Sequence, residues 1–224
     1  VLMVVSCLVT LELTGITVSF NSAPLEWWLS LPIIVIYPLL FGWVSYQTAT
    51  KLAEHKRRLQ VMSTRDGMTG VYNRRHWETM LRNEFDNCRR HNRDATLLII
   101  DIDHFKSIND TWGHDVGDEA IVALTRQLQI TLRGSDVIGR FGGDEFAVIM
   151  SGTPAESAIT AMLRVHEGLN TLRLPNTPQV TLRISVGVAP LNPQMSHYRE
   201  WLKSADLALY KAKKAGRNRT EVAA

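Results

Sequence analysis

The residues best suited to chemistry lie at an acidic tip between two short apolar runs. Residues 142–145 read Gly-Gly-Asp-Glu, and the flanking runs 136–141 and 146–150 predict the two strands of a β-hairpin. Glycines lack a Cβ atom, so a ligand can approach the backbone closely, and the carboxylates that follow are oxygen ligands for a hard cation such as Mg²⁺. This combination suits a metal-bound nucleoside triphosphate, although the four residues alone are equally compatible with an ordinary acidic turn.

A second acidic pair follows another apolar run. Residues 96–100 predict a buried central strand, and Asp101 and Asp103 lie at its end. Side chains at i and i+2 of a strand project to the same face. If this strand lies beside the hairpin, Asp101 converges with Asp144 and Glu145, and the three carboxylates predict a Mg²⁺ site with room for waters and substrate phosphates.

Polar side chains continue directly after this second pair. Residues 103–106 predict a turn out of the strand that offers backbone N–H groups and the Lys106 ammonium to phosphates. Asn109 and Asp118 provide an amide and a carboxylate, which can read the hydrogen-bonding edge of guanine. His114 lies between them, and a purely structural role for this imidazole stays open.

Composition divides the chain into two parts. It has 224 residues, 25 Lys and Arg against 22 Asp and Glu, a net charge of +3 and a pI near 9.0. The first fifty residues contain only Glu12 and Glu26 as charged side chains, whereas basic residues are frequent from Lys51 onward. The basic excess is compatible with phosphate ligands or an anionic membrane surface but is too diffuse for a nucleic-acid groove, so no nucleic-acid partner is expected. Cys7 and Cys88 lie in different parts, which argues against a disulfide framework.

The first part, residues 1–47, is predicted to be a membrane region. Residues 27–46 carry no charge, are long enough to cross a hydrocarbon core of about 30 Å, and have aromatic residues near both ends. A buried helix of a soluble protein is the alternative. The basic residues after position 50 place the rest of the chain in the cytoplasm by the positive-inside rule. Because the sequence begins within an apolar run and without methionine, we expect an N-terminally truncated, multi-pass membrane protein in contact with lipid.

The second part is predicted to be a helical linker, 48–64, followed by a globular domain, 65–220. Leu52, Leu59 and Met62 are near heptad spacing, which suggests that the linker pairs with its twin in a homodimer. In the domain, apolar periodicity predicts a helix with Trp77, Leu81, Phe85 and Cys88 on its buried face, then a strand at 96–100, a helix from 117, the hairpin, a helix at 154–172, a strand at 180–188 and a helix at 198–214. This order indicates an α/β fold with a mixed sheet covered by helices.

Residues 60–219 contain a set of motifs in order along the chain: Asp66-Gly-Met-Thr-Gly, Asn73-Arg-Arg, Asp101-Ile-Asp-His-Phe-Lys-Ser-Ile-Asn-Asp, His114-Asp-Val-Gly-Asp, Gly142-Gly-Asp-Glu-Phe and Tyr210-Lys-Ala-Lys-Lys-Ala-Gly-Arg-Asn. Together these motifs resemble the GGDEF-type diguanylate cyclases. The departures are Met68 where the family usually has leucine, and aspartate at 144, which is the family's common variant. The resemblance implies a ferredoxin-like sheet related to the palm of polymerases and nucleotide cyclases, and a bacterial inner-membrane enzyme that makes cyclic di-GMP and pyrophosphate from two GTP.

The resemblance also implies a role for each matching residue. Asp101, the carbonyl of Ile102 and Asp144 would hold Mg²⁺, with two ions per active site, and Asp144 and Glu145 would be catalytic. Each domain would hold one GTP, so two domains must face each other in a dimer. The residues expected to bind GTP are Phe105, Lys106, Asn109, His114, Asp118, Gly142, Gly143, Lys213 and Arg217.

A further pair, Arg133 and Asp136, has the spacing of the family's product-inhibition site. The resemblance implies that cyclic di-GMP binds there, with Arg164 as a third member; a solvated helix cap is the alternative interpretation. For the whole domain, a catalytically silent module that binds GTP or cyclic di-GMP is the main alternative to a cyclase, and a cyclase producing a mononucleotide is a weaker one. The intact carboxylates at the hairpin tip favour the active enzyme.

Overall fold

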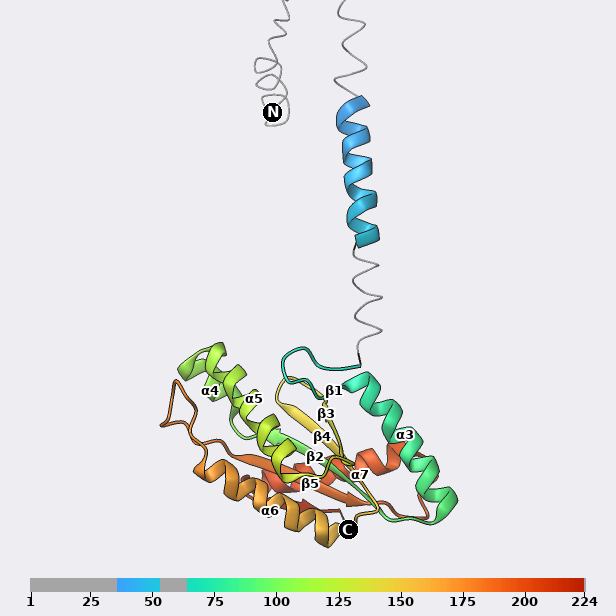
Figure 1. Cartoon of the computed structure of the whole chain (residues 1–224), viewed down its shortest axis with the longest axis vertical. Helices are drawn as coiled ribbons and strands as arrows, with labels where there is room; N and C mark the ends of the chain where they lie inside the picture. Colours follow the sequence, from blue (N-terminus) through green and yellow to red (C-terminus); the bar gives the residue numbers. More distant parts are fainter. Residues whose placement is uncertain (1–35, 53–63, 224) are drawn as a thin grey trace, which may run out of the picture. The chain divides into compact units, whose positions relative to one another are not determined.

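The computed structural model describes residues 36–52 and 64–223. The chain divides into two compact units, residues 1–62 and 63–224. In the first unit, residues 36–52 are helical (Figure 1). Their apolar side chains are largely exposed. Within the two described ranges, no helix combines the length and the apolar character needed to cross a membrane. Residues 27–35 of the predicted span and 53–63 of the predicted linker lie outside these ranges, so both stay predictions.

A six-stranded mixed sheet forms the centre of the second unit, in the order β1-β3-β4-β2-β5-β6. The central strand β2 is antiparallel to β4 on one side and to β5 on the other, and β3 is antiparallel to β4. The edge strands β1 and β6 run parallel to their neighbours β3 and β5. The bounds are β1 (Tyr72–Asn73), β2 (Ala95–Ile102), β3 (Val137–Arg140), β4 (Glu145–Ser151), β5 (Ile184–Pro190) and β6 (Thr220–Val222).

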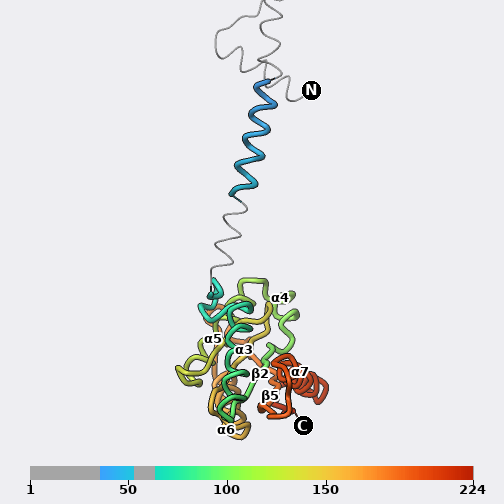
Figure 2. Tube along the Cα trace, turned by 90° about the vertical axis from the view of Figure 1, so that its right-hand side faces the viewer, coloured from blue at the N-terminus to red at the C-terminus, as the bar shows by residue number. Residues whose placement is uncertain are grey.

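Helices cover both faces of this sheet. The five are α3 (Arg74–His91), α4 (Phe105–Trp112), α5 (His114–Thr131), α6 (Ala155–Thr171) and α7 (Tyr198–Lys214). Alternate residues of the buried strands separate two cores: Leu98 and Ile100 pack with α5 and α6, whereas Leu97 and Ile99 pack with α3 and α7. Figure 2 shows α5 and α7 on opposite sides of β2 and β5. The predicted mixed sheet with helical cover is thereby confirmed.

The α3/α7 core carries two features that the sequence predicted well. The predicted stripe on α3 is buried at all four positions, and α7 has the predicted bounds. At Gly187 of β5, an added Cβ atom would lie 2.2 Å from the carbonyl oxygen of Ala205 and 2.3 Å from the amide of Leu209. Helix α7 therefore lies directly on the backbone of β5.

Several elements differ from their predicted form. The turn expected at 103–106 is limited to residues 103 and 104, and helix α4 follows from Phe105; with eight residues this helix has only about two turns, which is too short for a periodic pattern to identify it. The strand expected at 180–188 is β5, which begins only at Ile184. Val180 and Leu182 continue the alternating apolar pattern of a strand and are buried, but they lie outside it. Strands β1 and β6 have two and three residues, too few to show a period.

Candidate active site

Strand β2 and the hairpin tip meet at one end of the sheet. Asp101 lies opposite Glu145 in the antiparallel register of β2 and β4. Beyond this pair, the backbone N–H of Ile102 donates a hydrogen bond of 3.3 Å to the carbonyl oxygen of Asp144. The expected contact between the two acidic segments is confirmed, and it places Asp101 and Glu145 on the face of the sheet that α7 covers.

Asp101 lies in a mostly buried and strongly charged environment. It is 8% exposed, and its Oδ2 atom is 2.7 Å from Nζ of Lys213 on α7. Burial raises the pKa of Asp101 above its ordinary value; the Lys213 ammonium opposes this effect, and the charges of Asp144 and Asp103 add to it. A nearby cation stabilises the charged form of a buried carboxylate that lies beside another carboxylate, and the Lys213 ammonium does this for Asp101.

The predicted cage of three carboxylates does not form. Across residues 36–52 and 64–223, no three His, Cys, Asp or Glu side chains are grouped closely enough to hold a metal. In the structure, Oδ2 of Asp101 is paired with Lys213. Oε2 of Glu145 lies by the hairpin backbone, 3.0 Å from the position of a Cβ atom at Gly142. The remaining oxygen donors are two carboxylates, Asp101 and Asp144, and the backbone.

Glu145 also has a perturbed acidity. Burial raises the pKa of its carboxyl group, as do the charges of Asp101 and Asp144, while Lys213 lowers it. A carboxyl group with a raised pKa binds and releases protons closer to neutral pH than an exposed one does.

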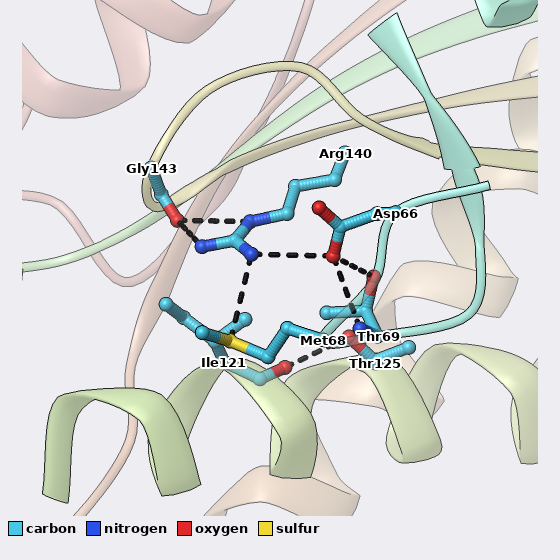
Figure 3. A network of polar contacts seen from close by, with 7 residues as sticks. All are labelled: Asp66, Met68, Thr69, Ile121, Thr125, Arg140 and Gly143. Carbon is cyan, nitrogen blue, oxygen red and sulfur yellow. Dashed lines mark hydrogen bonds and ion pairs between the residues drawn. The ribbon is translucent and has the colours of Figure 1, made fainter. Parts of the chain in front are cut away.

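Arg140 fixes the hairpin tip. Its Nε and Nη2 atoms donate to the carbonyl oxygen of Gly143 at 3.2 and 2.7 Å, and its Nη1 donates to Oδ1 of Asp66 at 3.2 Å (Figure 3). The same Asp66 oxygen accepts from the backbone N–H and the hydroxyl of Thr69. Burial raises the pKa of Asp66, but the Thr69 hydrogen bonds and the Arg140 charge outweigh it, so the net pKa is below the ordinary value.

This clamp joins two of the sequence motifs. Asp66 and Arg140 are 74 positions apart in the sequence. The Arg140 guanidinium nevertheless contacts both the Asp66 side chain and the carbonyl of Gly143 in the hairpin. The sequence alone assigned no role to Arg140 or Asp66. Asp66 begins one motif and Arg140 lies two residues before another, but this placement does not say which side chains pair.

The predicted guanine-reading residues come from two packed helices. Asn109 is on α4, and His114 and Asp118 are in the first two turns of α5. A Cβ atom at Gly117 would lie 1.9 Å from Oδ1 of Asn109, so only glycine admits the amide there. Oδ1 of Asn109 is buried and has no hydrogen-bond partner, which leaves an acceptor to be satisfied by a ligand or water. His114 is exposed, as is Asp118.

The expected phosphate-binding cations lie at two helix ends. Lys106 is exposed in the first turn of α4, next to the half-buried Phe105. Lys213 is in the last turn of α7, and the exposed Arg217 follows that helix with a positive φ of 61°. Lys213 is brought to Asp101 directly.

Arg133 and Asp136 line a small separate cavity of about 220 Å³, together with residues that include Arg65 and Tyr72. Oδ2 of Asp136 accepts the backbone N–H of Arg133 at 2.9 Å, whereas its Oδ1 is buried without a partner. Burial raises the pKa of Asp136, and the Arg133 N–H and charge oppose this effect. The expected third member, Arg164, is exposed on α6 and is not among the residues that line the cavity.

Comparison with known proteins agrees with this arrangement. Residues 63–219 match the family described as "Diguanylate cyclase, GGDEF domain". Diguanylate cyclase DosC of Escherichia coli strain K12 is 35% identical over 159 residues, which are 70% of this chain and 34% of DosC. Cyclic di-GMP phosphodiesterase NbdA of Pseudomonas aeruginosa strain PAO1 is 30% identical over 193 residues, 80% of this chain and 25% of NbdA.

A solved structure is similar over the same region. The coiled coil and GGDEF domain of DgcB from Caulobacter crescentus, in complex with c-di-GMP, has a TM-score of 0.69 and 28% identity, and the match covers 82% of this chain and 99% of that one. The chain spans about a third or less of the length of DosC and NbdA, with 34% and 25% covered. The family match covers most of the chain and its domain carries the acidic hairpin beside β2, so this chain belongs to the GGDEF-domain family of diguanylate cyclases.

Proposed function

We propose that this chain is a diguanylate cyclase that condenses two GTP molecules into cyclic di-GMP and releases pyrophosphate. The observation that carries the proposal is the register of β2 and β4, which brings Asp101 to the Gly142-Gly143-Asp144-Glu145 tip. The similarity to DosC, which is named a diguanylate cyclase, and the c-di-GMP in the DgcB complex support it.

The donor set at this site fits Mg²⁺. Asp101, the carbonyl of Ile102 and Asp144 would hold the ion through hard oxygen atoms, and the site keeps positions for waters and phosphates. When bound, Mg²⁺ would screen the charge that develops on the reacting phosphate. We propose two ions per active site. Lys213, which neutralises Asp101 in the structure, would turn to the triphosphate when a metal ion replaces it.

The remaining site residues would orient the nucleotide. Asn109 and Asp118 would read guanine with His114 beside them, and the unpartnered Oδ1 of Asn109 is a suitable acceptor. Glu145, with its raised pKa, would assist the proton transfer from a ribose 3′-hydroxyl as this group attacks the α-phosphate of the second GTP. The groups proposed to contact the phosphates are Phe105, Lys106, Gly142, Gly143, Lys213 and Arg217.

The reaction needs two GTP molecules, and the residues proposed to bind GTP occur once in each domain, so each domain would hold one GTP. We therefore propose a homodimer in which two domains face each other, joined through the linker 48–64. Crosslinking of the intact protein through this linker is expected to trap a dimer, and an exclusively monomeric product would count against the pairing.

We also propose that residues 1–47 anchor the protein in the bacterial inner membrane, with the catalytic domain in the cytoplasm. The uncharged run 27–46 and the basic residues that follow it support this location. Membrane fractionation tests it, since recovery of the intact protein in the aqueous fraction would contradict anchoring.

Incubation of the chain with GTP and Mg²⁺ tests the activity. We expect cyclic di-GMP and pyrophosphate, and no product when the metal is removed with a chelator. The second candidate is a silent module that binds guanine nucleotides, and the similarity to NbdA, which is named a cyclic di-GMP phosphodiesterase, supports it. Nucleotide binding without any dinucleotide product would select this second candidate.

Product inhibition is proposed for the cavity at Arg133 and Asp136. The unpartnered Oδ1 of Asp136 could accept from guanine, and the Arg133 guanidinium could pair with a phosphate or with guanine. We expect Arg133→Ala to require at least about tenfold more cyclic di-GMP for half-inhibition, because a hydrogen bond to a charged group is lost.

Initial rates at increasing product concentration measure this effect. Arg126→Ala, which removes an exposed arginine from α5, is the matched control and should be inhibited like the parent. Equal inhibition of Arg133→Ala and the parent would remove the inhibitory assignment.

A further inference from the structure

Asp103, which follows strand β2, contacts the turn after the C-terminal end of helix α7. Asp103 is 5% exposed, and both of its carboxylate oxygens are used. Oδ1 accepts the hydroxyl of Ser185 at 2.7 Å, and Oδ2 accepts the backbone N–H of Asn218 at 2.8 Å. Asp103 thus binds a strand neighbour on one side and a turn 115 residues away on the other.

The turn that Asp103 holds has an unusual backbone. Gly216 follows the C-cap of helix α7 and has a φ of 110°, and the N–H of Arg217 donates to the carbonyl of Ala212 at 3.0 Å, which is the Schellman pattern of a glycine-terminated helix. The next two residues, Arg217 and Asn218, also have positive φ, 61° and 46°. This region is unfavourable for residues with a side chain, so surrounding contacts must hold it in place.

The Asp101-Ile-Asp103 segment makes a second contact with α7. Asp101, two residues before Asp103, contacts the side chain of Lys213 in the last turn of the helix. The β2 motif therefore contacts this helix end at two places: the side chain of Lys213, and the backbone of Asn218 next to Arg217. Arg217 itself is exposed.

We propose that Asp103 is a positioning residue for the triphosphate of GTP, acting through the turn 216–218 that carries Arg217. This inference rests on the proposed function, because that function assigns Arg217 to the phosphates. Asp103 itself does not touch substrate. Its buried carboxylate accepts the hydrogen bond of the Asn218 N–H. This hydrogen bond stabilises the positive-φ conformation of the turn, and the turn sets the direction in which the Arg217 side chain projects.

A double-mutant cycle in the full chain tests the proposal. Asp103→Ala is expected to raise KM for GTP about tenfold at saturating Mg²⁺, which is the loss expected for one hydrogen bond to a charged group. In the Arg217→Ala background the same substitution should change KM less than about twofold, because the residue through which it acts is gone. An equal factor in both backgrounds would overturn the proposal.

Two further variants separate positioning from general destabilisation. Asp103→Asn keeps one carbonyl oxygen as an acceptor and should give an intermediate KM; it also replaces Asp103→Ala in the cycle if that variant does not fold. Ser185→Ala removes the other hydrogen bond and leaves the Asn218 contact, so its KM should stay near that of the parent. An increase in KM for Ser185→Ala as large as that for Asp103→Ala would contradict the specific role of the turn.

Two readouts independent of turnover complete the test. Hydrogen exchange should be faster at residues 216–218 in Asp103→Ala than in the parent, and the affinity for a non-hydrolysable GTP analogue should fall as KM rises. Faster exchange with unchanged analogue affinity would refute the positioning role. A parent chain that binds no analogue and forms no product would instead refute the proposed function, while the exchange result would still show whether Asp103 holds the turn.

Discussion

Replacement of Asp144 or Asp101 by alanine is expected to lower the rate of cyclic di-GMP formation by at least about two to three orders of magnitude. Both carboxylates lie where β2 meets the hairpin tip, and they are the side-chain oxygens proposed to hold Mg²⁺. Removal of either one takes away both a ligand of the ion and a fixed charge next to the reacting phosphate. The loss should appear in kcat at saturating GTP and should not be restored by excess Mg²⁺.

Steady-state kinetics of the two variants and the parent measure this effect, with circular dichroism to confirm that each is folded. Asp86→Ala is a suitable control because it makes the same chemical change at an exposed position of α3. Turnover close to that of the parent in either Asp101→Ala or Asp144→Ala would show that the metal assignment is wrong.

The second large effect is expected on stability, from Gly187→Ala. The added Cβ atom would lie 2.2 Å from the carbonyl oxygen of Ala205 and 2.3 Å from the amide nitrogen of Leu209. Both contacts are with the backbone of α7, so no side-chain rotation can relieve them. We expect a loss of about 3 kcal/mol in the free energy of unfolding, at the upper end of the usual cost of overpacking. Because α7 carries Lys213, activity should fall as well.

Denaturant unfolding followed by circular dichroism measures the loss. Gly67→Ala is the matched control, since no atom lies within 4 Å of a Cβ atom at that position and its stability should stay near that of the parent. An unfolding midpoint for Gly187→Ala equal to that of the parent would mean that α7 can move away from β5 without cost.

Much of the fold could be predicted from local pattern. The stripe Trp77, Leu81, Phe85 and Cys88 repeats at helical spacing, and all four side chains are buried. The apolar run of β2 indicates a strand that is buried on both faces, and all eight of its residues are buried. The elements that were missed are short: α4 has eight residues, and β1 and β6 have two and three, so each is too short for its pattern to be recognised in the sequence.

The sequence by itself determined which residues could do chemistry and which family they belong to, because motif identity and spacing are local properties of the chain. Only the tertiary structure decided how those residues pair. It placed Lys213 on Asp101, Arg140 between Asp66 and Gly143, and Asp103 beneath the turn after α7. It also placed Oε2 of Glu145 beside Gly142, and the described residues contain no cluster of three carboxylates. These contacts join positions up to 115 residues apart, and their geometry is determined by strand register and helix packing rather than by local sequence.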